Sequence, residues 1–276
     1  DKKVLLRSDG TSVYITQDLG TALMKTEEHQ LDGQIYVVGN EQNYHFKVLF
    51  RVLEKLGYDW AKNLHHLSYG MINLPEGKMK SREGTVVDAD ELIDELTALA
   101  KAEIESRQGD AVDDDIDLRA RKIALAALKF MILAVSPQTT MLYDPKASVS
   151  FEGDTGPYVL YAYARIQRML NDSGIPATDR DFDAGQLGDP SEVKLVLALL
   201  AFPGVVARAA ADLNPSLVST WLIETARAYH SHNRAVMILK AETEALRRAR
   251  LALSRATAIG LKRGLYLLGI ETVDRM

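Results

Sequence analysis

Residues 34–57 read QIYVVGNEQNYHFKVLFRVLEKLG, a short apolar run followed by a segment with helical spacing. The first six residues are typical of a strand, and Asp32 and Gly33 before them are typical of a turn. Beyond residue 45, apolar residues recur every three or four positions until Gly57 ends the pattern, namely Phe46, Leu49, Phe50, Leu53 and Leu56. A strand that leads directly into a helix indicates a parallel sheet in an open α/β domain.

A second short run lies upstream. Residues 12–16 are rich in β-branched and aromatic side chains and follow the turn signal of Asp9 and Gly10, so they too are predicted to form a strand before a helix. Open α/β sheets bind ligands at the carboxyl ends of their strands, which directs attention to residues 14–18 and 39–45.

Downstream, the character of the chain changes at a polar, acidic connector over residues 108–115. Beyond it we find no convincing strand, but helical spacing over residues 118–135, 155–171, 191–213, 216–240 and 242–268. The predicted fold class is therefore α/β followed by all-α, with one domain over residues 1–115 and a helical domain over residues 116–276.

Composition excludes several classes of protein. The 276 residues are 47% apolar and 26% charged, which is typical of a globular protein, and there is no cysteine for a disulfide, a thiolate metal site or a cysteine nucleophile. No long apolar run or leader is apparent, so we expect no membrane span and a cytoplasmic protein. We predict no metal site, because His230 and His232 would lie on different faces of a helix.

The charge is unevenly distributed. The net charge is −5, yet residues 216–276 hold ten Arg and Lys against five Asp and Glu, a local net charge of +5. This asymmetry permits a surface that faces phosphates at the C-terminal end, although a basic helix face can also be merely solvated.

Residues 77–87 contain the clearest candidate for phosphate chemistry. Lys78, Lys80 and Arg82 lie between two glycines, on a segment predicted to be a loop before a helix that starts near residue 88. Basic side chains on a loop can neutralise the charge of a triphosphate without covalent chemistry. The alternative is a solvated basic loop with no ligand.

Three segments, taken together and in this order, resemble the arginyl branch of the class I aminoacyl-tRNA synthetases. They are residues 14–20, residues 38–46, and a KMSKS-like signature that reads Lys78-Met79-Lys80-Ser81-Arg82. The resemblance covers essentially the whole chain. It implies the second half of a Rossmann-like catalytic domain with a parallel sheet, joined to a helical-bundle anticodon-binding domain.

The resemblance implies roles for individual residues. Tyr14, Asp18 and Gln42 would bind arginine, the carboxylate accepting guanidinium hydrogen bonds in a fork while the aromatic ring closes over the side chain. Lys78, Lys80 and Arg82 would be catalytic, and the ATP-binding residues would be His45, Lys78, Met79 and Lys80. From local sequence alone, Asp18 could instead cap the following helix, and His45 could be a core residue. ATP with Mg²⁺ would be a substrate complex rather than a bound cofactor.

The helical half resembles the anticodon-binding domain of the same family, on the motif Gly156-Pro157-Tyr158. Thr155 is predicted to cap this helix, with Pro157 in its first turn. Tyr158, Tyr161 and Arg165 would share one helix face that suits single-stranded bases, although Tyr163 is expected to pack in the core. The resemblance also implies tRNA contacts by His232 and by the C-terminal Met276.

The sequence lacks one motif that the family carries. No histidine precedes Tyr14, so a HIGH-type motif is not found. We therefore expect the C-terminal portion of a monomeric arginine–tRNA ligase, inactive alone, with tRNA(Arg), arginine and ATP as partners. The alternative is a non-catalytic tRNA-binding module, which upstream sequence would distinguish. A class I synthetase for another amino acid is disfavoured by Asp18 and by residues 158–165.

Overall fold

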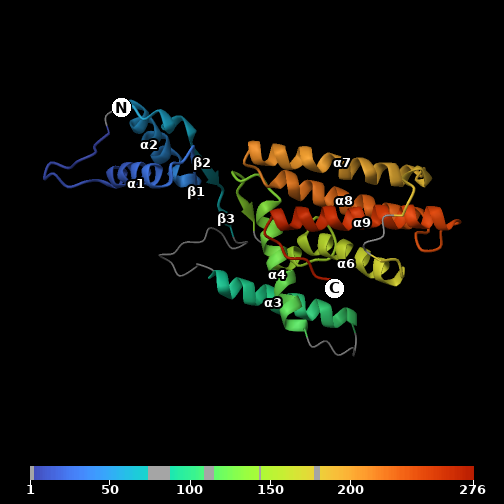
Figure 1. Cartoon of the computed structure of the whole chain (residues 1–276). Coiled ribbons are helices and arrows are strands. Elements are labelled where there is room, and N and C mark those ends of the chain that lie inside the picture. Colours follow the sequence, from blue (N-terminus) through green and yellow to red (C-terminus); the bar gives the residue numbers. More distant parts are fainter. Residues whose placement is uncertain (1–2, 74–87, 109–114, 143, 177–180) are drawn as a thin grey trace. The chain divides into compact units, whose positions relative to one another are not determined.

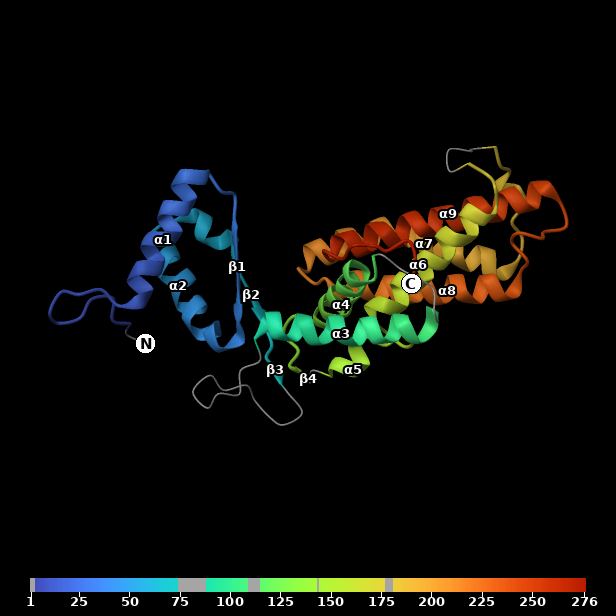
Figure 2. The same cartoon turned by 90° about the horizontal axis from the view of Figure 1, so that it is seen from below.

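The computed structural model describes residues 3–73, 88–108, 115–142, 144–176 and 181–276, which form two compact units (Figure 1, Figure 2). The α/β unit consists of the described residues up to Asn73 together with Pro137–Leu142, and the helical unit consists of the others. The predicted domain boundary at residues 115/116 stays a prediction. By its contacts, helix α3 (Ala89–Gln108) packs against α4 (Ile116–Leu133) in the helical unit.

The α/β unit is built around a parallel pair of strands. Strands β1 (Gln34–Gly39) and β2 (Leu64–Tyr69) pair in register from Gln34 with Leu64 to Gly39 with Tyr69. Between them lie η1 (Asn40–Gln42), α2 (Asn43–Lys55) and η2 (Asp59–Asn63). A shorter parallel pair joins β3 (Ile72–Asn73) to β4 (Met141–Leu142). The strand, the helix and the parallel pairing predicted from residues 34–57 are confirmed.

The predicted strand over residues 12–16 is wrong. Helix α1 (Tyr14–His29) begins there instead, and only Ser12 forms an isolated bridge, with Leu6. Ile15, Leu19 and Ala22 of α1 are 2%, 7% and 0% exposed and pack in one core with Phe46, Leu49 and Leu53 of α2. Spacings of four and three bring these side chains onto one helical face, and their burial outweighs the strand preference of a five-residue run.

The helical unit confirms the predicted helical segments, with bounds shifted by a few residues. Its remaining helices are α5 (Pro145–Ser148), α6 (Gly156–Asp172), η4 (Ala184–Gln186), α7 (Pro190–Ala211), α8 (Ser216–Ala235) and α9 (Glu244–Leu267). Helix α8 ends at Ala235 rather than near residue 240, because Val236 is extended, with φ −127° and ψ 148°. Helices α7, α8 and α9 lie side by side (Figure 1).

The start of α6 is fixed by a cap and by a close approach of two helices. The Thr155 hydroxyl accepts a hydrogen bond from the Tyr158 amide at 3.1 Å, which confirms the predicted cap. A Cβ atom on Gly156 would lie 2.4 Å from the carbonyl oxygen of Ala126 on α4. Only glycine therefore allows the two backbones to pack this closely.

A buried ion pair joins α7 to α9. Glu192, 0% exposed, accepts a hydrogen bond from Arg250 Nε at 2.7 Å and from the amides of Gly188 and Asp189 at 2.8 and 2.9 Å. Burial raises the pKa of Glu192, but the hydrogen bonds from Arg250 and the two amides outweigh it and hold that pKa below its usual value. The charged carboxylate is thus part of the packed structure.

By length and composition alone, α7 is also apolar enough to cross a membrane, a test that core helices of soluble proteins pass as well. Glu192, inside this helix, is the carboxylate of the buried pair with Arg250. The expectation that the chain has no membrane span stays a prediction.

Candidate functional site

The structure brings Asp18 and His45 together from two helices. Nε2 of His45 lies 2.7 Å from Oδ2 of Asp18, although the two residues are 27 positions apart in the chain. Asp18 is one turn after Tyr14 on α1, so both side chains lie on the same side of that helix. Gln42 ends η1, three residues before His45. The predicted arginine-binding residues therefore lie on elements that are packed together.

The alternative role of Asp18 as a helix cap is wrong. Helix α1 starts four residues earlier, and its N-cap is Val13. The Asp18 side chain is 46% exposed and Tyr14 is 82% exposed, so this unit presents the carboxylate and the ring on an open surface. The predicted closure of the Tyr14 ring over arginine stays a prediction.

The Asp18 carboxylate lies beside the first turn of α2. Its partner His45 is in the first turn of α2. The N-terminal end of a helix carries the positive end of the helix dipole, which attracts a negative group such as this carboxylate. The charge of Asp18 in turn reaches Tyr36 on β1, whose pKa is raised first by burial and then by this carboxylate. The site can accordingly attract and orient a cationic group.

The KMSKS-like residues Lys78, Met79, Lys80 and Arg82 lie outside the described residues. Their predicted contacts with ATP stay predictions.

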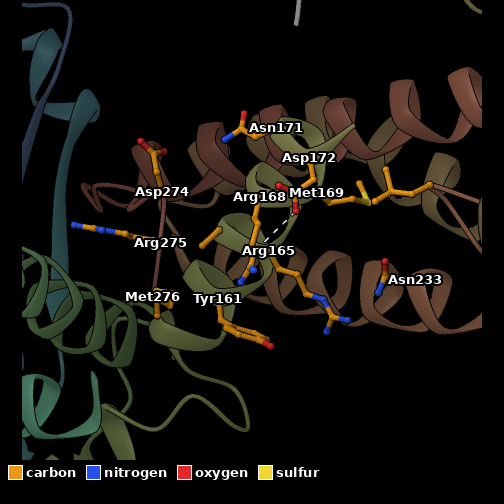
Figure 3. A pocket seen from close by; sticks show the side chains of 12 residues that line it. Tyr161, Arg165, Arg168, Met169, Asn171, Asp172, Asn233, Asp274, Arg275 and Met276 are labelled. Atoms are coloured by element: carbon orange, nitrogen blue, oxygen red, sulfur yellow. Dashed lines mark ion pairs between the residues drawn. The ribbon is translucent and has the colours of Figure 1, made fainter. Parts of the chain in front are cut away.

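A cavity of about 630 Å³ in the helical unit contains part of the predicted tRNA-binding set (Figure 3). Tyr161 and Arg165 reach it from α6, and Met276 reaches it from the C-terminal segment. Arg165 has no carboxylate partner among the residues that the structure describes. An aromatic ring beside a guanidinium suits an unstacked base and its phosphate.

Two other predicted tRNA-binding residues lie elsewhere. Tyr158 is half-buried and packs on the ring of His230 at 5.3 Å between centroids, outside the cavity lining. His232 is 0% exposed, and its Nδ1 lies 3.1 Å from the Ser191 hydroxyl, so its ring does not reach the surface. The prediction of a tRNA contact by His232 is therefore corrected: tertiary packing of α8 against α7 covers it. Tyr163 is 2% exposed and packs in the core, as expected.

The sequence analysis missed Arg168 and Asn233, which also line the cavity. Arg168 is three residues after Arg165, and this helical spacing could have placed both on one face. It forms an ion pair with Asp172 at 3.9 Å (Figure 3). Asn233 comes from α8, and no local pattern indicates that α8 contributes to this surface.

His230 is expected to make the stability of the chain depend on pH. It is 8% exposed and stacks on Tyr161, and burial, followed by the charges of Arg165 and Arg234, lowers its pKa to about 4. The unfolded chain binds this proton near pH 6.5 and the folded chain does not, so the stabilisation is complete above pH 6.5 and is lost as the pH falls toward 4. Between pH 7 and 4.5 we expect His230 to account for a loss of roughly 2–3 kcal/mol.

Urea unfolding at the two pH values measures this loss, with His230→Phe as the comparison. The variant keeps an aromatic ring at this position but cannot titrate. The free energy of unfolding of the wild type should therefore fall relative to that of the variant as the pH falls. A difference that stays constant over this pH range would contradict the assignment.

Comparison with known proteins matches two family models to the two parts of the chain. Residues 2–143 match the model described as tRNA synthetases class I (R), catalytic domain. Residues 159–276 match the DALR anticodon binding domain. The first match covers half of the chain, and the second covers α6 from residue 159 through the C-terminal segment that lines the cavity.

Two similar curated relatives are the arginine–tRNA ligases of Treponema denticola and Bacteroides thetaiotaomicron. They are 46% and 45% identical over 100% of this chain, which covers 48% and 47% of their own lengths. The chain thus spans about half the length of these relatives. Among solved structures, the Thermus thermophilus arginyl-tRNA synthetase is similar, with a TM-score of 0.90, 28% identity, and coverage of 99% of this chain and 51% of its own. The catalytic-domain match, the anticodon-domain match and these relatives show that the chain belongs to the arginyl-tRNA synthetase family of class I.

Proposed function

We propose that the whole protein is an arginine–tRNA ligase, which joins arginine to ATP with release of pyrophosphate and then transfers it to tRNA(Arg). The observation that carries this proposal is the Asp18 carboxylate, held by His45 and one turn from Tyr14, in a chain of this family. A carboxylate of this kind can pair with the guanidinium of arginine in a fork.

In this proposal the protein positions substrates and neutralises charge. Tyr14, Asp18 and Gln42 bind arginine so that its carboxylate can attack the α-phosphorus of ATP, which enters with Mg²⁺ as a substrate complex. Lys78, Lys80 and Arg82 would stabilise the charge of the phosphates. By the family resemblance, Met79 and His45 would lie near the nucleotide. We further propose that the protein acts in the cytoplasm as a monomer.

We propose that this chain needs further residues for catalysis, and the exposed side chains of β1 support this. Ile35 and Val37 on β1 are 54% and 63% exposed, whereas parallel sheets are usually covered on both faces. We expect the 276-residue chain to bind tRNA without forming arginyl-adenylate. A protein in which this chain is joined to the remaining half of a curated relative, called the joined protein below, should do both.

The experiment is arginine-dependent exchange of pyrophosphate into ATP in the presence of tRNA(Arg), with a panel of amino acids in place of arginine as the control. Exchange that the joined protein catalyses with arginine, and with no other amino acid of the panel, supports the proposed ligase. Absence of exchange with every amino acid, together with tRNA binding by the chain, would favour the second candidate, a non-catalytic tRNA-binding module. The separate core of the helical unit supports that candidate.

Tyr161→Ala is expected to weaken binding of the tRNA(Arg) anticodon stem-loop to the chain about tenfold, since stacking on one ring contributes about 1–3 kcal/mol per base. Tyr161 lines the cavity, whereas Arg208, exposed on α7, does not. Fluorescence anisotropy with a labelled stem-loop measures the change, and Arg208→Ala is the control. Equal affinities of wild type and Tyr161→Ala would place the anticodon elsewhere.

A further inference from the structure

We propose that His45 is a positioning residue for the arginine-reading carboxylate, holding Asp18 in the orientation that receives a guanidinium. This inference rests on the proposed function. It differs from the role near the nucleotide that the family resemblance implies for His45, and the two roles predict different kinetic defects.

The first support is the hydrogen bond itself. A carboxylate can only accept, so Nε2 of His45 carries the proton and donates it to Oδ2 of Asp18. The separation of 2.7 Å is in the range of strong hydrogen bonds to a charged acceptor. Among the residues that the structure describes, no other hydrogen bond to Asp18 is formed. Oδ1 therefore remains for a ligand, while Oδ2 keeps further accepting capacity.

The second support is that both residues are fixed by their neighbours in the core. Leu19, next to Asp18, is 7% exposed, and Phe46, next to His45, is 8% exposed. The two belong to the same hydrophobic core, which packs α1 against α2. The Phe46 ring also meets the His45 ring edge-on, at 5.6 Å between centroids. The imidazole is thus a rigid donor, whereas the Asp18 side chain is 46% exposed and would otherwise rotate in solvent.

The third support is geometric. A fork of two guanidinium hydrogen bonds requires the plane of the carboxylate to be set before the ligand arrives. A donor on a neighbouring helix sets that plane, because it fixes the rotation about the last bond of the Asp18 side chain. Without the donor, binding of arginine must order this side chain as well, and affinity falls.

The test is kinetic, on the joined protein. We expect His45→Ala to raise the KM for arginine roughly 5- to 10-fold, the cost of ordering one more side chain on binding, and to leave the KM for ATP unchanged. His45→Gln places an amide donor near the position of Nε2, so it should return the KM for arginine to within about twofold of wild type. His29→Ala, an exposed histidine at the end of α1, is the matched control.

A double-mutant cycle separates positioning from a general effect on folding. In an Asp18→Asn background the donor has lost its charged acceptor, so His45→Ala should change the KM for arginine less than it does in wild type. A raised KM for ATP with an unchanged KM for arginine would overturn the inference in favour of a nucleotide contact. Unchanged values for both substrates would overturn it as well. If wild-type joined protein activates no arginine, it is the proposed function that fails.

Discussion

Asp18→Asn is expected to lower kcat/KM for arginine activation by the joined protein about a thousandfold, since a site built to pair with a polar substrate group loses several orders of magnitude in kcat/KM when that pairing is lost. The bound guanidinium would face a neutral amide, whose NH₂ group cannot accept a hydrogen bond. His45 would lose its charged acceptor at the same time. Pyrophosphate exchange at varied arginine concentrations measures this effect.

The control for this variant is Asp32→Asn, which removes an exposed carboxylate from the turn before β1 and should leave activation unchanged. Binding of tRNA(Arg) should be the same for Asp18→Asn and wild type, because the cavity of the helical unit does not contain Asp18. A loss of less than about tenfold in kcat/KM would contradict the role of Asp18 as the main partner of the guanidinium.

Glu192→Ala is expected to destabilise the 276-residue chain by about 3–5 kcal/mol, the usual cost of breaking a buried ion pair by removing one partner. The variant leaves the guanidinium of Arg250, 7% exposed, without its closest carboxylate. It also removes the acceptor of the Gly188 and Asp189 amides at the start of α7. Urea unfolding followed by far-UV circular dichroism measures the change in the free energy of unfolding.

The matched control is Arg208→Ala on the same helix. Arg208 pairs with Asp212 at 3.4 Å, but its side chain is 75% exposed, so the variant should change stability by less than about 1 kcal/mol. The double variant Glu192→Leu with Arg250→Met should be more stable than Glu192→Ala, since no buried charge is left unpaired. Similar losses for Glu192→Ala and Arg208→Ala would show that the burial of the first pair contributes nothing.

Local sequence determined most of the elements, because their signals lie within one or two helical turns. The apolar run and the helical spacing over residues 34–57 predicted β1, α2 and the end of the helix before Gly57. The φ of Gly57 is +90°, a conformation that residues with a side chain rarely adopt. Thr155 and Pro157 predicted the start of α6 in the same way. The Tyr14 and Asp18 pair, Gln42 and the KMSKS-like loop likewise came from the sequence through its resemblance to a family.

Tertiary structure alone decided which of these residues meet and which are covered. Packing of Ile15 and Leu19 turned a predicted strand into α1. The contact of His45 with Asp18 spans 27 residues, and that of Arg250 with Glu192 spans 58, so neither has a local signal. His232 is covered for the same kind of reason, since α7 and α8 bury it together. Periodicity fixes the face of a single helix, but the partner of that face depends on the packing of the whole unit.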